Sequence, residues 1–161
     1  MWFYKKNHAG NANASDKDLA AYLNLYIDFR LKVLDARELG MDQDTTYLAE
    51  VKEYESSLNA QKRVTKSKPE YTFMLNEYQD AVLMFNLTEQ KIWSRSLNEE
   101  TELRNFYGTH KNDYPEGSFD DVKLQVITDY QQSLENKWVA ELRKKYTVKV
   151  NQDELRKLAK P

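Results

Sequence analysis

The chain has 161 residues, with 4 Gly, 3 Pro and no Cys. So few turn-forming residues exclude an all-β sandwich, and the lack of Cys excludes disulfides, thiolate metal sites and cysteine nucleophiles. The 24 basic and 26 acidic residues give a net charge of -2, so the chain lacks the basic surplus typical of nucleic-acid binding. The sequence also contains no run of about 20 apolar residues, the length that a membrane-spanning helix needs.

The first long helix is predicted over residues 16–39. Ser15 is a suitable N-cap residue, and Gly40 is the residue expected just after the C-terminus. The apolar arc of this helix is broad and contains Leu19, Tyr22, Leu23, Tyr26, Ile27, Val33 and Leu34. The polar residues opposite are Lys17, Asn24, Asp28, Lys32 and Asp35. We expect the carboxylates Asp28 and Asp35 to be solvated or capping charges.

Arg30 and Arg37 lie inside this apolar arc, seven residues apart. We expect their stems to pack and their guanidinium groups to pair with an acid on a neighbouring helix. The alternative is that they form the polar lining of a groove that binds another polypeptide.

Two further helices are predicted before the middle of the chain. Asp42 and Asp44 mark the start of a helix over roughly 45–63, whose narrow apolar stripe is typical of a surface helix. A short polar connector at 64–69 leads to a helix over roughly 70–86, with Pro69 suited to its first turn. The inner face of the second of these helices is Tyr71, Met74, Leu75, Tyr78, Val82 and Phe85, and its far side carries Phe73, Leu83, Met84 and Leu87.

A helix that is apolar on both sides is either buried between neighbours or presents a binding patch. Phe73, Met84 and Leu87 are therefore candidates for a binding surface, with burial in the core as the alternative. Thr88 and Asn98 are expected to cap two short helical segments that follow, the first of which carries Trp93.

The longest helix is predicted over 119–146, after a loop at 111–117. Ser118 and Asp121 form a capping box at its start. Its apolar residues recur every four positions: Val122, Val126, Tyr130, Leu134, Trp138, Leu142 and Tyr146. Such a stripe rotates by roughly 240° over six steps, so this helix should contact several neighbours in turn and be the central one.

The sequence therefore predicts an all-α fold, a single domain of about six helices around a long C-terminal helix. Residues 147–150 are compatible with a short extended segment, and Asn151 can cap a final helix at 152–159. The N- and C-terminal segments should pack together, and the connectors at 64–69 and 111–117 should be tight surface loops.

No catalytic motif is present, whether P-loop, dinucleotide-binding, serine-hydrolase or zinc-protease. His8 and His110 lie in polar segments, where surface exposure is expected, and two histidines cannot form a three-histidine metal site. No catalytic residue, metal or cofactor is predicted. Lys137 and the run 143–145 are expected to be surface charges favoured by the helix dipole, with contact to acidic lipid or a client as the alternative.

Three stretches resemble one known family. DLAAYLNLYIDFRLKVLDARELGMD (18–42) resembles the N-terminal chaperone segment of SurA-like periplasmic proteins, the parvulin-type peptidyl-prolyl isomerases of the Gram-negative envelope. Residues 71–114 resemble a later helical segment of these proteins, and residues 118–158 their C-terminal segment. Parvulin domains would be expected after the first and second stretches, where only residues 64–68 and 115–117 stand here. The chain thus resembles the helical chaperone core without its isomerase domains, with segments 1–63, 70–114 and 118–161 joined by short connectors.

The resemblance implies an ATP-independent periplasmic holdase that binds unfolded outer-membrane proteins, although no apolar signal segment is seen in the sequence. The client-contact residues we expect are Phe73, Met84, Leu87 and Trp93, with Arg30 and Arg37 as second choices. One alternative is a helical adaptor with one defined partner, which competition among unrelated peptides would distinguish. Another is an enzyme that retains isomerase activity, which a prolyl-peptide isomerisation assay tests.

Overall fold

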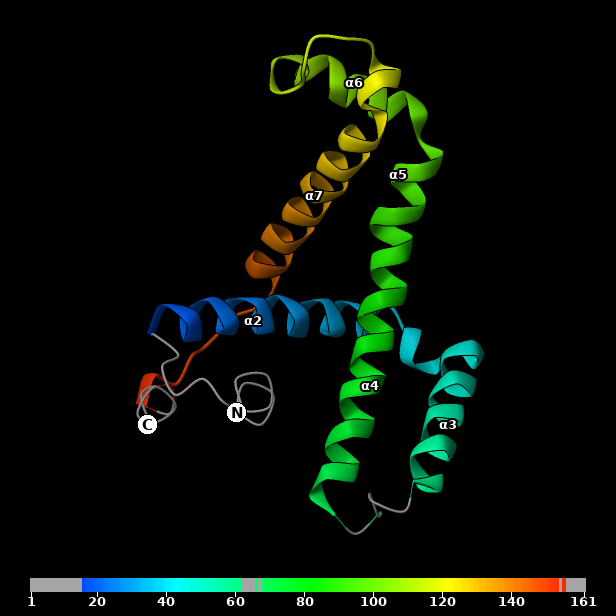
Figure 1. Ribbon diagram of the computed structural model, residues 1–161. Helices are drawn as coiled ribbons and strands as arrows, with labels where there is room; N and C mark the ends of the chain where they lie inside the picture. The colour runs from blue at the N-terminus through cyan, green and yellow to red at the C-terminus, as the bar shows by residue number, and fades with distance from the viewer. Residues whose placement is uncertain (1–15, 62–65, 67, 154, 156–161) are drawn as a thin grey trace.

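The computed structural model describes residues 16–61, 66, 68–153 and 155 (Figure 1). These residues form an all-α structure, as predicted, and contain no strand. The elements are α2 (Asp16–Glu38), a 3-10 turn (Met41–Gln43), α3 (Thr45–Ala60), α4 (Pro69–Thr88), a π-helical turn (Glu89–Trp93), α5 (Ser94–Asn98), α6 (Glu100–Thr109), a 3-10 turn (Lys111–Asp113) and α7 (Phe119–Lys145). The Ser15 cap, His8, most of the first connector and the end of the predicted final helix lie outside the described residues.

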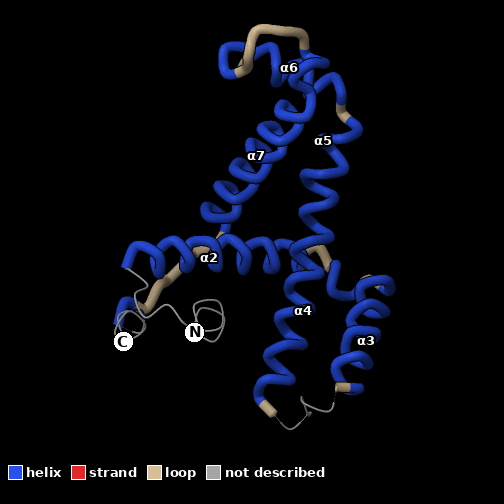
Figure 2. Tube along the Cα trace, viewed as in Figure 1, coloured by secondary structure: helices blue, strands red, loops and turns tan. Residues whose placement is uncertain are grey.

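One long helical rod organises the fold. α4, the π-helical turn and α5 run on as a single continuous helix (Figure 2). α3 pairs with the first half of α4 as a hairpin, and α2 crosses the rod (Figure 1). α6 packs at the far end of the rod, from which α7 returns diagonally to α2. No helix of the described residues is long and apolar enough to cross a membrane.

Local capping explains three of the helix boundaries. The Asp44 carboxylate accepts hydrogen bonds from the backbone N–H groups of Thr46 and Tyr47, at 2.8 and 3.2 Å. Gly40 follows α2 with φ of 73°, a left-handed conformation that glycine adopts without strain. Ser118 and Asp121 form the predicted capping box at the start of α7.

The predicted caps at Thr88 and Asn98 are wrong. The Thr88 hydroxyl donates to the carbonyl of Met84 at 2.7 Å, and the Asn98 amide donates to the carbonyl of Ser94 at 2.8 Å, so both side chains bond within the preceding turn. The rod continues past Thr88 through the π-helical turn, which keeps Ile92 buried. Two predicted helices therefore merge into one.

The chain ends of the described region partly match the expectations. Residues 147–150 form no strand, and the Asn151 side chain accepts from the backbone N–H of Asp153 at 3.1 Å, as expected of a cap. Residues 111–117 form the predicted surface loop, which Tyr114 anchors in the interior.

Two hydrophobic clusters are linked by α7. The main core lies where α2, α3, α4, the π-helical turn and α7 meet, and Val33 and Leu83 are fully buried in it. The second core joins α6 to the first half of α7 around Leu103 and Val126. The apolar stripe of α7 passes from the second core to the main core, so this helix contacts several neighbours in turn, as predicted.

The far side of α4 is covered rather than exposed at Leu87. This side chain is only 1% exposed, because the π-helical turn and the crossing helices enclose that part of the rod. Phe85, predicted on the inner face, is exposed instead. Leu87 is therefore a core residue, and its prediction as a client contact is wrong.

Truncating Leu87 should destabilise the fold. Leu87→Ala removes fully buried methyl groups, and we expect the free energy of unfolding to fall by about 2–5 kcal/mol in urea titrations followed by circular dichroism. Leu124→Ala is the matched control, because Leu124 lies on α7 and is 82% exposed; its effect should stay within about 0.5 kcal/mol. Equal losses in the two variants would contradict the assignment of Leu87 to the core.

Candidate functional site

A buried carboxylate ties α2 to α4. Asp80 of α4 is buried and accepts hydrogen bonds from both Arg30 and Arg37 of α2, with Arg37 Nη2 at 2.7 Å from Asp80 Oδ1. The two arginines are two helical turns apart and approach the same carboxylate from either side. The predicted pairing with an acid on a neighbouring helix is thus confirmed. As the partners of Asp80, the two guanidinium groups help to position α2, and Arg30 also lines a groove between α2 and residues 146–151.

A second buried carboxylate ties α2 to α7. Asp35 accepts a hydrogen bond from the Trp138 indole at 3.0 Å and forms ion pairs with Lys145 and Lys91 at 3.2 and 3.3 Å. Lys32 is also buried, pairs with Glu135 and lies 5.3 Å from the centre of the Trp138 ring.

The prediction that Asp35 is solvated is therefore wrong, and Lys32, on the same polar side of α2, is buried as well. These two residues meet partners on α7 that are 103 positions away in the chain, which helical periodicity alone does not show. The basic cluster at the end of α7 is likewise engaged with α2: Arg143 pairs with Asp28 at 2.6 Å and Lys145 with Glu38 at 2.6 Å.

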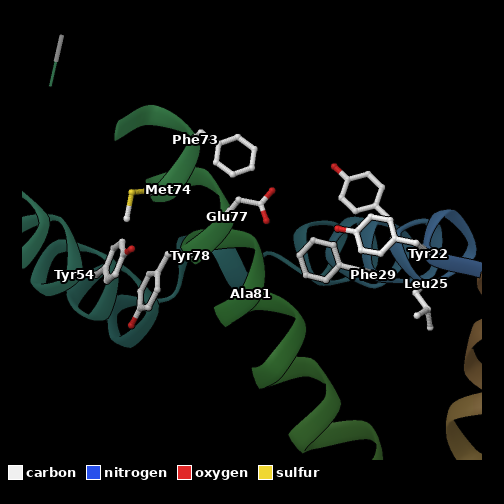
Figure 3. Close-up of a pocket in the computed structure, with 10 residues that line it drawn as sticks. Tyr22, Leu25, Phe29, Tyr54, Phe73, Met74, Glu77, Tyr78 and Ala81 are labelled. Carbon is white, nitrogen blue, oxygen red and sulfur yellow. The ribbon is translucent and has the colours of Figure 1, made fainter. Parts of the chain in front are cut away.

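An aromatic groove lies in the corner between α2 and the first half of α4 (Figure 3). It has a volume of about 400 Å³. The lining residues are Tyr22, Leu25, Tyr26 and Phe29 from α2, Tyr54 from α3, and Phe73, Met74, Glu77, Tyr78 and Ala81 from α4. On the α3 side, the rings of Tyr54 and Tyr78 stack with centroids 3.7 Å apart. We call this space the aromatic groove.

A more polar groove of about 440 Å³ lies on the adjoining face of α2, against α7. Met84 lines it together with several polar and charged side chains: Asp28, Lys32, Gln132, Glu135, Asn136 and Arg143. Leu25 and Phe29 border both grooves, and Leu25 is 70% exposed at the boundary. We call this second space the polar groove.

The predicted contact residues do not form one patch. Phe73 lies in the aromatic groove and Met84 in the polar groove, whereas Leu87 is in the core. Trp93 lies twenty residues beyond Phe73, roughly 30 Å further along the rod, where its ring meets the ring of Phe85 edge-on at 5.0 Å. The structure therefore brings Phe73 together with the aromatic residues of α2 and separates it from Trp93.

Most of the α2 side of the aromatic groove was missed as a binding surface. Tyr22, Leu25, Tyr26 and Phe29 follow the spacing i, i+3, i+4, i+7, which places them on one helical face. The same face continues toward the C-terminus of α2 through Val33 and Ala36, which are wholly buried. This spacing could have indicated a binding surface on α2, but the same spacing is typical of a helix face that packs into the core.

The aromatic groove has a mainly apolar lining, whereas apolar and charged side chains mix in the polar groove. Among the described residues, no group of three or more His, Asp or Glu side chains could hold a metal ion. His110 is exposed, as predicted, and its ring stacks on Phe106.

Comparisons of the chain with protein-family models, with curated proteins and with solved structures found no match. The resemblance to SurA-like chaperones stays a prediction from the residues themselves.

The Asp35 tie should make stability depend on pH. Burial raises the pKa of Asp35, but hydrogen bonds from Trp138 and Lys145, together with the charge of Lys91, outweigh it and leave the pKa below its ordinary value. A carboxyl with a lowered pKa in the folded state stabilises the fold above its unfolded pKa, and this stabilisation is lost as the pH falls through the folded pKa.

Asp35→Asn should therefore lower the free energy of unfolding by about 1–3 kcal/mol at pH 7 and by less at about pH 3. Urea titrations at the two pH values measure the difference. Asp113→Asn, on an exposed turn, is the control and should change little at either pH. A loss in Asp35→Asn that is the same at both pH values would exclude the ionised carboxylate as the stabilising group.

Proposed function

We propose that this chain is the client-binding framework of an ATP-independent chaperone that holds unfolded polypeptides. The client class we propose is unfolded outer-membrane proteins, and the compartment is the periplasm. The observation that carries the proposal is the aromatic groove, in which the stripe of α2 faces Phe73 of α4, while Met74 and Tyr78 extend the lining toward α3.

Such a lining suits clients of many sequences. Aromatic rings supply a large apolar contact area, and a flexible Met side chain adapts to different shapes. Unfolded strands of membrane β-barrels expose alternating apolar and aromatic residues, which could enter the groove without a fixed sequence. No nucleotide is needed for release, because a client that folds buries its own apolar side chains and no longer competes for the groove.

A helical adaptor with one defined partner is the second candidate, and the polar groove favours it. Charged and amide side chains at fixed positions impose directional hydrogen bonds, which select one complementary surface. Competition separates the two functions: unrelated aromatic-rich peptides should displace one another from a holdase, whereas an adaptor should be blocked by one sequence.

Removing apolar area from the aromatic groove should weaken holdase activity. Leu25 is largely exposed, so Leu25→Ser combined with Phe73→Ser should leave most of the packed core unchanged. We expect the concentration needed for half-suppression of aggregation to rise about tenfold, because each lost apolar contact removes about 1.5–3 kcal/mol at most. Light scattering of an outer-membrane β-barrel protein diluted from urea measures it.

The matched control is Leu97→Ser with Leu124→Ser, which removes two exposed leucines that line neither groove. It should suppress aggregation like the unaltered protein. Full suppression by the groove variant with unchanged helix content, or an equal loss in the control, would overturn the proposed site.

A further inference from the structure

Glu77 is the one charged side chain in the described lining of the aromatic groove. It lies on α4 one turn after Phe73 and one turn before Ala81. Its carboxylate extends toward the gap between α4 and the aromatic side chains of α2 (Figure 3).

This carboxylate has no counter-ion among the described residues. It accepts no hydrogen bond and forms no ion pair with them, and the nearest arginine, Arg30, is already bonded to Asp80. Burial raises the pKa of Glu77, and the charge of Asp80 raises it further, while the charges of Arg30 and of the amino terminus act in the opposite direction without outweighing them. Glu77 is thus partly dehydrated and forms no direct pair with any of the described residues.

The charge of Glu77 affects how favourably different segments bind in the groove. A neutral apolar segment would cover the carboxylate and leave it unpaired, which is unfavourable, and an acidic segment would add repulsion. A lysine or arginine would pair with Glu77, and the surrounding rings of Tyr22, Phe29 and Phe73 could hold the same cation by cation–π contact.

We infer that the aromatic groove selects unfolded segments in which a lysine or arginine adjoins aromatic residues, and that the Glu77 carboxylate pairs with the positively charged side chain. This inference rests on the proposed holdase function and adds the class of segment that the holdase prefers. Charge complementarity supports it, because Glu77 places one carboxylate in an otherwise uncharged, mainly apolar lining.

Three fluorescein-labelled peptides test it, Gly-Phe-Thr-Phe-Lys-Phe-Thr-Gly and its versions with Gln or Glu in place of Lys. Fluorescence anisotropy with the full chain should give a Kd about tenfold lower for the Lys peptide than for the Gln peptide, and the weakest binding for the Glu peptide. Glu77→Gln should bind the Lys and Gln peptides equally.

Glu141→Gln is the matched control, since Glu141 is an exposed carboxylate on α7 that does not line the groove. It has the same change in net charge and should keep the preference for Lys. Equal binding of the Lys and Gln peptides by the unaltered protein, or a preference that survives in Glu77→Gln, overturns the inference while leaving the holdase function standing. Binding of none of the peptides would count against the holdase function itself.

Discussion

Helix α2 crosses two other helices, and two buried carboxylates hold it in place. Asp80 of α4 bonds Arg30 and Arg37 of α2, while Asp35 of α2 bonds Trp138 and lysines of α7 and the rod. Removing one partner of a buried ion pair leaves an uncompensated charge, so sliding or rotating α2 would be costly at both ties. Polar bonds thus specify the register of a helix whose apolar residues could have packed in several ways.

Part of the apolar surface of α2 lies outside the core. Leu25 and Phe29 are on the same helical face as the buried Val33 and Ala36, but nearer the N-terminus of α2 this face borders the two grooves. The ties to Asp80 and Trp138 hold α2 against α4 and α7, and so they fix the position of the binding surface that we propose for unfolded clients. The placement of Glu77 among the rings adds a charge preference to that surface.

Local chemistry made several helix boundaries predictable, whereas the partners of most distant contacts did not follow from the sequence, even where a pairing was expected for Arg30 and Arg37. Asp44 and Gly40 act within a few residues of the helix ends that they define, so their roles could be recognised directly. Thr88 looked like a cap, but burial of its neighbours in the main core favours a continuous rod. Asp35 looked solvated because Trp138, its partner, is 103 positions away. The aromatic groove needs stripes from two helices, and only the crossing of α2 over α4 brings them together.

Site-specific photocrosslinking tests most directly whether unfolded chains bind beside α2. A photoreactive phenylalanine analogue would replace Leu25, at the boundary of both grooves, or Leu124, which is exposed on α7 and lines neither. Each protein would be irradiated with an unfolded outer-membrane protein, and the adducts would be separated by gel electrophoresis. We expect a strong adduct from position 25 and only background from position 124. Equal yields from both positions, or no adduct from position 25, would contradict binding at the α2 grooves.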